Sequence, residues 1–291
     1  MTPRIETQRK ALIDQVAQKA QGEFKGRSGK IAETFVRTFY ANVPPTDIAP
    51  QSADNLYGAA ASFWKFAQKR KPGQPKIRVF NPVEAEHGWR TGHTVIEILN
   101  DDMPFLVDSV TAELNYQGLT VHLIIHPIVD IERDKSGKLL DCTGAPNGTA
   151  AAGKPESCMH FEVSEQTDPA AIVHITAQLE RVLSDVRASV EDWPKMCDVA
   201  AEILEGLRAQ SPQLPLEDVK EAEAFLEWIN DDHFTFLGYR EYDHVGSGKS
   251  QKLKAAPGAL GVLRDADRSI VERWADNEPL PSDIRAFMRQ P

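Results

Sequence analysis

The stretch TVIEILNDDMPFLVDSVTAELNYQGLTVHLIIHPIVDIERD, residues 94–134, decides the fold of this chain. Residues 94–99 alternate apolar side chains with polar or β-branched ones, which is typical of a strand. The turn Asn100-Asp101-Asp102 interrupts that strand, and the apolar residues after Pro104 recur at helical spacing up to Gly118. Residues 119–133 return to a β-rich pattern. The stretch therefore predicts a strand, a helix and a second strand.

This unit is half of a ferredoxin-like split βαβ fold. A further β-rich segment at 77–81 precedes it, and consecutive strands usually lie side by side, so we expect it to pair with 94–99. We predict an α+β domain in a permuted ββαββα order, whose antiparallel sheet carries its helices on one face. The predicted elements are strand 77–81, strand 94–99, helix 104–117, strand 119–133, strand 158–164 and helix 168–190, the last with Asp168 as its N-cap.

The flanking segments predict further domains. Helical patterns at 5–41 and 55–68 predict a helical N-terminal subdomain over 1–75, followed by the α+β domain over 76–192. We expect the basic run 69–71 to be a solvated helix end, and the Gly- and Ala-rich segment 135–157 to be a hairpin extension that does not pack. Two helices, 193–209 after a break at Pro194 and 216–229, predict a connector over 193–230. The β-rich segments after it predict a second, incomplete β unit over 231–291 that ends in a helical turn at 282–291.

Composition argues against several classes of function. The formal net charge of −10 over 291 residues argues against a general binder of nucleic acids or anionic membranes. No apolar run has the length of a membrane span, and the first residues lack the apolar core of a signal peptide. Three cysteines form no CxxC pair, which argues against a disulfide framework and a structural zinc site. We expect a protein of the reducing cytoplasm.

Four segments resemble one family, in the same order along the chain. They are NDDMPFLVDSV (100–110), GLTVHLIIHPI (118–128), FLEWINDDHFTFLGYREYD (225–243) and PGALGVLR (257–264). They resemble the N-terminal part of the large, multidomain bacterial NAD-dependent glutamate dehydrogenases. The resemblance implies ACT-like domains here, the second one beginning at residue 231, and a dehydrogenase domain downstream. It also implies a parent enzyme that converts L-glutamate, NAD and water to 2-oxoglutarate, ammonia and NADH.

The sequence carries no pattern typical of a catalytic site. Neither Gly-containing segment, 144–148 or 257–261, has the strand, helix and acidic residue that form a dinucleotide-binding turn. No phosphate-binding loop and no nucleophile elbow are present. We therefore expect no catalytic residue and no cofactor in this chain, and NAD only elsewhere in the parent enzyme.

The acidic turn is the strongest candidate for ligand binding. It comprises Asn100, Asp101, Asp102, Met103, Pro104 and Phe105, and it resembles the first strand–helix loop of ACT domains, where an effector amino acid binds. N–H groups at a helix start attract a carboxylate, and a nearby aspartate pairs with an ammonium group. The family's loop usually has glycine where this chain has Phe105. In the alternative interpretation, Asp102 caps the helix, Asp101 is solvated and Phe105 belongs to the core.

Three histidines form a second candidate site. His122 and His126 share a face of a regular strand because they are four residues apart, and His160 lies on the strand expected beside it. Three imidazoles can bind a metal, but no fourth ligand is evident, so we expect no bound metal at these histidines. We expect instead that His122, Ile124, His126 and His160 form a face that docks on another subunit or domain. The turn 230–233 echoes 100–102, and we expect it to be a structural connector.

These expectations together predict a regulatory and assembly region. Its expected partners are the downstream domains of the same polypeptide, further copies in a homo-oligomer, and an amino-acid effector, with no nucleic acid and no membrane. One alternative is a stand-alone ACT-like protein that senses an amino acid and regulates another enzyme. A third class is a metal-dependent hydrolase built on the histidines, which would contain bound zinc.

Overall fold

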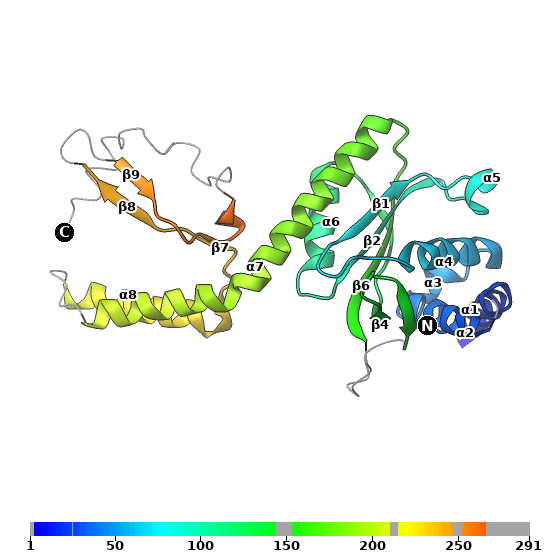
Figure 1. Cartoon of the computed structure of the whole chain (residues 1–291), viewed down its shortest axis with the longest axis horizontal. Coiled ribbons are helices and arrows are strands. Elements are labelled where there is room, and N and C mark those ends of the chain that lie inside the picture. The colour runs from blue at the N-terminus through cyan, green and yellow to red at the C-terminus, as the bar shows by residue number, and fades with distance from the viewer. Residues whose placement is uncertain (1–2, 25, 144–152, 210–214, 247–251, 266–291) are drawn as a thin grey trace. The chain divides into compact units, whose positions relative to one another are not determined.

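The computed structural model describes residues 3–24, 26–143, 153–209, 215–246 and 252–265. The chain divides into two compact units, residues 1–183 and residues 184–291. Unit 1 contains a mixed set of helices and strands (Figure 1), which confirms the α+β class. The long helix α7, Pro169–Ala209, begins in unit 1 and continues into unit 2.

Four helices precede the sheet of unit 1. They are α1 (Pro3–Glu23), α2 (Arg27–Phe39), α3 (Pro45–Ile48) and α4 (Ala53–Ala67). The break between the first two lies at Gly26, whose φ of 68° is in the left-handed region that glycine adopts without strain. Ser52 caps α4 by accepting a hydrogen bond from the backbone N–H of Asn55 at 3.1 Å.

The sheet of unit 1 has six antiparallel strands. They are β1 (Lys76–Phe80), β2 (His93–Asp101), β3 (Val121–Ile125), β4 (Ile128–Arg133), β5 (Leu139–Cys142) and β6 (Lys154–Ser164). Their order is β1-β2-β6-β4-β5, and β3 also pairs with β6. β1 pairs with β2, which confirms the permuted order. The short helix α5 (Glu84–His87) lies in the connection between them.

Two expectations about this sheet are wrong. The segment 119–133 is not one strand, because it divides at Pro127, which has no N–H to donate to a ladder. The segment 135–157 does pack in part, since its strand β5 pairs with β4 and buries Leu139 and Cys142. Residues 144–152 of that segment lie outside the described residues.

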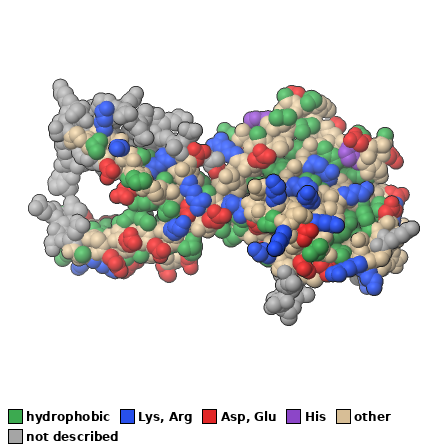
Figure 2. Space-filling view, viewed as in Figure 1, with side chains coloured by type: hydrophobic (Ala, Val, Ile, Leu, Met, Phe, Trp, Pro, Cys, Tyr) green, Lys and Arg blue, Asp and Glu red, His purple; other side chains and the backbone are tan. Residues whose placement is uncertain are grey.

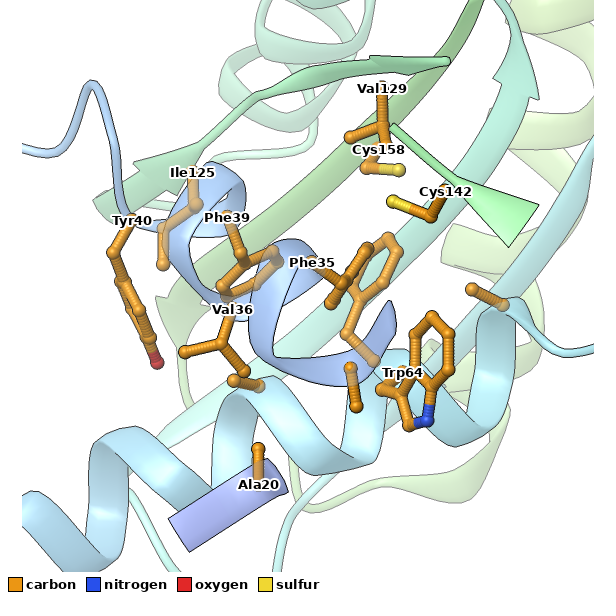
Figure 3. Close-up of a cluster of buried hydrophobic side chains, with 14 of the residues drawn as sticks. Ala20, Phe35, Val36, Phe39, Tyr40, Trp64, Ile125, Val129, Cys142 and Cys158 are labelled. Atoms are coloured by element: carbon orange, nitrogen blue, oxygen red, sulfur yellow. The ribbon is translucent and has the colours of Figure 1, made fainter. Parts of the chain in front are cut away.

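Helices cover both faces of the sheet. Helices α6 (Leu106–Tyr116) and the start of α7 lie on one face, as expected for a sheet with its own helices on one side (Figure 1). The N-terminal helices cover the other face. In Figure 3, Phe35, Phe39 and Trp64 pack towards Ile125, Val129 and Cys158 of the sheet. The helices before the expected boundary near residue 75 therefore share one hydrophobic core with the sheet that follows it, although the proposed domain limits themselves stay a prediction.

Unit 2 contains the remainder of α7 and shorter elements. These are α8 (Leu216–Trp228), a π-helical turn (Ile229–His233), β7 (Gly238–Tyr239), β8 (Tyr242–Val245), β9 (Lys252–Ala255), β10 (Leu260–Gly261) and a 3₁₀ turn (Val262–Arg264). β7 pairs with β10, and β8 with β9. The carboxylate of Asp192 in α7 accepts a hydrogen bond from the Gly261 N–H at 2.9 Å and pairs with Arg264.

The expected break at Pro194 is wrong, because α7 runs through that residue without interruption. Residues 234–242, a strongly β segment by sequence, contribute only β7 and the first residue of β8. In the turn 230–233, the left-handed φ of 56° at Asp232 ends the helical path before the strands begin. The helical turn expected at 282–291 lies outside the described residues.

The surface carries both signs of charge. Basic and acidic side chains are interspersed on the face that Figure 2 draws. No helix in the described part of the chain combines the length and the apolar character that crossing a membrane requires.

Candidate functional site

The acidic turn leaves β2 and enters α6. Its first acidic residue, Asp101, is only partly solvated, because its side chain is 31% exposed and its carboxylate accepts a hydrogen bond from the guanidinium of Arg70 at 2.6 Å. Arg70 belongs to the basic run that we expected to be exposed, yet it is only 4% exposed. The expectation that Arg70 is exposed was wrong, because its partner Asp101 lies far away in the sequence and a local pattern does not reveal it.

A buried ion network supports this end of the sheet. Glu156 of β6 lies opposite Asp101 in the register and accepts hydrogen bonds from Arg70 Nε at 3.1 Å and from Arg133 Nε at 2.6 Å. All three members, Glu156, Arg70 and Arg133, have side chains that are almost fully buried. Burial opposes the charged form of Arg70, but Glu156 and Asp101 outweigh it, so the pKa of Arg70 is raised. The network fixes the backbone from which the turn begins.

The start of α6 has no side-chain cap. Asp102 does not cap the helix; its backbone N–H donates to the carbonyl of Pro155 at 3.1 Å, and the residue before the helix is Phe105. Phe105 has a left-handed φ of 69°, and its side chain is 50% exposed, so it is not a core residue. The two parts of the alternative interpretation that concern Asp102 and Phe105 are therefore wrong. Phe105 takes the backbone conformation that glycine would supply in the family's loop.

The turn lines a pocket of about 510 Å³, which we call the loop pocket. Its lining includes residues 102–108 of the turn and of α6, together with His126 and Ile128. The first N–H groups of a helix have no partner within the helix, and here no side chain caps them. His126 Nε2 lies 2.8 Å from Ser157 Oγ, and burial lowers the pKa of His126 although Asp102 opposes this shift. The pocket thus combines a helix start without a side-chain cap, the carboxylates of Asp102 and Asp108, and the imidazole of His126.

The three histidines do not meet. The exposed His122 stacks on His93 with ring centroids 4.2 Å apart, and His126 lines the loop pocket. His160 is fully buried and packs edge-on against Phe39 of α2. A bulge between positions 121 and 123 breaks the regular alternation that we had assumed for this strand. Among the described residues, no three His, Cys, Asp or Glu side chains are arranged to hold a metal ion.

His160 lies in a buried charged cluster that the sequence interpretation missed. Its Nδ1 and Nε2 lie 3.8 Å from carboxylate oxygens of Glu97 and Glu162. Burial lowers the pKa of His160, but the two carboxylates outweigh burial and raise it. Burial raises the pKa of Glu162, but His160 and His93 outweigh it and lower it to about 2. A charged residue inside an otherwise apolar strand pattern, as Glu97 is within 95–99, was the signal that could have revealed the cluster.

The remaining residues of the expected docking face lie on β3. Ile124 is partly exposed, and β3 pairs with β6 alone among the described strands. One edge of β3 therefore has backbone groups free of any ladder in the described part of the sheet. His160 does not contribute to this face, because its side chain is buried under α2.

Comparison with known proteins shows which family this part of the chain is similar to. Residues 35–179 match the family model described as "Glutamate dehydrogenase, ACT1 domain". These residues include the turn, the sheet and the first turns of α7.

Whole-chain comparisons find similar proteins in three bacteria. The NAD-specific glutamate dehydrogenase of Halomonas elongata is 40% identical over 255 residues, which is 87% of this chain and 16% of that protein. The protein of the same description from Pseudomonas aeruginosa is 32% identical over 209 residues, or 72% of this chain and 13% of that protein. The one from Mycobacterium tuberculosis is 24% identical over 185 residues. The chain thus spans no more than about a sixth of the length of these relatives.

Proposed function

We propose, from the premise that residues 35–179 form a glutamate dehydrogenase ACT1 domain, that this chain is the N-terminal regulatory and assembly region of an NAD-dependent glutamate dehydrogenase. The reaction of the parent enzyme is the conversion of L-glutamate, NAD and water to 2-oxoglutarate, ammonia and NADH. We place that chemistry and the NAD site outside this chain. The observation that carries the proposal is the loop pocket, which lies at the connection between β2 and α6 of the matched domain.

The regulatory part of the proposal assigns an amino-acid effector to the loop pocket, with residues 100–105 as its site. The effector carboxylate accepts hydrogen bonds from the uncapped N–H groups of α6, and its ammonium group pairs with Asp102. The Arg70–Glu156–Arg133 network supports this assignment because it holds the turn on a rigid base. Effector binding regulates only if the effector has different affinities for two states of the enzyme.

The assembly part of the proposal uses the free edge of β3. His122 and Ile124 lie on this strand, and an unpaired strand edge accepts a strand from another chain. We propose that the parent enzyme is a cytoplasmic homo-oligomer in which this edge and the downstream domains of the same polypeptide make contacts. His126 belongs to the loop pocket in this proposal.

Isothermal titration calorimetry on this chain with a panel of the standard amino acids tests the effector site. We expect saturable binding of at least one amino acid, and a loss of affinity of roughly tenfold in Asp102→Asn, since a charge-assisted hydrogen bond contributes about 1.5–3 kcal/mol. The matched control is Asp218→Asn, which removes an acidic residue from the first turn of α8. An affinity that is unchanged in Asp102→Asn would show that the effector does not bind in the loop pocket.

A second measurement links the turn to the parent enzyme. In the full-length protein, Asp101→Ala removes a partner of the buried Arg70, and we expect it to change the response of glutamate oxidation to the effector. The alternative is a stand-alone amino-acid sensor. It predicts that the native protein, isolated from its own cells, has no glutamate dehydrogenase activity and still binds an amino acid.

A further inference from the structure

Helix α8 of unit 2 buries very little of its surface. Val219 is the one buried residue among its thirteen, all of which the structure describes. Glu223 and Glu227 follow Val219 at intervals of four residues, so the three share one side of the helix. Both carboxylates pair with Arg208 of α7, which runs alongside α8 (Figure 1). This side of α8 therefore lies against α7.

The opposite side of α8 is exposed, and we call it the outer face of α8. Its residues are Asp218, Glu221, Phe225 and Trp228, which share a side because they are three or four positions apart. Phe225 is 58% exposed and Trp228 is 48% exposed, and both carboxylate side chains are exposed as well. The outer face thus combines two acidic side chains in its first half with two aromatic rings in its second half.

The aromatic part of this face continues past the end of the helix. The rings of Phe225 and Trp228 are stacked with centroids 6.3 Å apart, and those of Trp228 and His233 with centroids 5.2 Å apart. The left-handed φ of 56° at Asp232 lies at the turn that brings His233 back to the helix, where its Nδ1 is 3.1 Å from the carbonyl oxygen of Trp228. Phe234, which follows directly, is also half-exposed. Exposed aromatic side chains that gather in this way mark an interaction site.

The charge around the rings is strongly negative. Residues 216–233 contain one basic residue, Lys220, and seven acidic ones: Glu217, Asp218, Glu221, Glu223, Glu227, Asp231 and Asp232. Two copies of this surface placed against each other would bring like charges together, which disfavours a symmetric pairing of the outer face with itself. A cationic partner is favoured twice, because lysine and arginine pair with carboxylates and also lie well over aromatic rings.

We propose that the outer face of α8 binds a basic, amphipathic helical segment of the parent polypeptide that lies outside this chain. The apolar side of that segment covers Phe225 and Trp228. Its lysine or arginine side chains pair with Asp218 and Glu221.

The choice of the same polypeptide rests on the proposed function, which it deepens by naming a surface of unit 2 and the chemistry of its partner. The relatives leave ample chain for such a segment, since this chain spans at most about a sixth of their length. A segment that is covalently linked also acts at a high effective concentration.

Fluorescence anisotropy with a synthetic helical peptide of leucine and lysine tests the chemistry of the face on this chain. We expect saturable binding that weakens as salt is added, and affinity that falls roughly tenfold or more in Trp228→Ala, as at the centre of an interface. The control, Trp193→Ala, removes another exposed tryptophan of unit 2 and should leave the affinity unchanged. No saturable binding, or equal affinity in Trp228→Ala and the unmodified chain, would overturn the proposal.

A charge reversal tests the acidic half without removing a ring. We expect Glu221→Lys to weaken the peptide roughly threefold or more, because the exposed carboxylate becomes a like charge. Glu205→Lys, at an exposed position of α7 in unit 2, is the matched control and should have little effect. A peptide in which glutamate replaces lysine should not bind. Equal binding of the two peptides would show a purely apolar surface and contradict the assigned partner.

Hydrogen exchange of the full-length enzyme tests the source of the partner. We expect the amides of α8 to exchange roughly tenfold or more slowly there than in this chain, because the linked segment occupies the face, and we expect the labelled peptide not to bind. Peptide binding as tight as to this chain would show that the face is free for a separate protein. Protection of α8 that grows with the concentration of this chain would show a second copy. Either result contradicts the inference.

The same measurement separates this inference from the proposed function. A full-length protein that oxidises glutamate while α8 exchanges as fast as in this chain would overturn the inference and keep the proposed function. A full-length protein without that activity in which α8 is protected would overturn the proposed function and keep the surface assigned to α8.

Discussion

At position 105 the chain holds a phenylalanine in a backbone conformation that glycine adopts with less strain. The φ of 69° places Phe105 in the left-handed region, and its half-exposed side chain buries too little surface to explain the choice by packing alone. Such strain is often found where a loop meets a ligand. The contribution of the Phe105 backbone conformation to stability can therefore be measured separately from that of its side chain.

A pair of variants makes this separation. Phe105→Ala removes the side chain and keeps the backbone strain, whereas Phe105→Gly removes both. We expect Phe105→Gly to be more stable to urea than Phe105→Ala by about 1 kcal/mol, because a left-handed conformation costs a non-glycine residue roughly 1–2 kcal/mol. Equal free energies of unfolding would indicate that the turn relaxes to another conformation once the ring is gone.

Single-residue roles were the least predictable part of the site. The positions of the turn follow from the pattern around residue 100, but the environment of Asp101 depends on Arg70, which is 31 residues away along the chain. Likewise the buried state of His160 depends on α2 packing across the sheet. Local patterns carry no information on which distant side chain arrives as a partner, so Asp101 was interpreted as solvated and His160 as a surface residue.

At the scale of elements, α4 lies very close to the connection that precedes β2. This close approach requires glycine at position 58 of α4, because any side chain there would collide with Trp89. A Cβ built on Gly58 would lie 2.2 Å from the Cβ of Trp89, and real atoms do not approach so closely. The glycine of α4 thus lets Trp89 lie directly against this helix, where it is almost fully buried.

We expect Gly58→Ala to destabilise unit 1 by about 1–3 kcal/mol, as overpacking of a closed core does. Chemical denaturation monitored by tryptophan fluorescence measures this change. The matched control is Gly22→Ala in α1, where a Cβ meets nothing within 4 Å, and where alanine should stabilise the helix by up to about 1 kcal/mol. A destabilisation that is the same in both variants would contradict the role given to the contact with Trp89.

The order of elements in unit 1 was largely predictable, because periodicity and caps are local. The N-cap of α7 is an example: Asp168 accepts a hydrogen bond from the N–H of Ala170 at 2.9 Å, as its position before Pro169 predicted. The errors came from tertiary contacts that override local signals. Strand β5 forms in a weakly apolar segment because β4 supplies a ladder partner, and α7 continues through Pro194 where a break was expected.

At the scale of the whole molecule, the covered and free surfaces of the sheet determine how the chain can associate. The N-terminal helices cover one face and α6 with the start of α7 covers the other (Figure 1), so neither face is available to a second subunit. Among the described strands, β1 and β5 at the ends of the sheet and β3 beside β6 each pair on one side only, and of these three β3 carries the exposed His122 and Ile124. Association through this region is therefore expected to join strand edges, not sheet faces.

This argument predicts that a charge on β3 will prevent association of the chain. We expect analytical ultracentrifugation of the parent chain to show a concentration-dependent dimer, and Ile124→Lys to shift it to the monomer by roughly tenfold or more in dissociation constant, since a lysine on a strand edge disfavours edge-to-edge pairing. The control, Val173→Lys, places the same charge at an exposed apolar position on α7 and should leave the dimer intact. A parent chain that stays monomeric, or a dimer that survives Ile124→Lys but not Val173→Lys, would show that β3 is not the surface through which copies of this region meet.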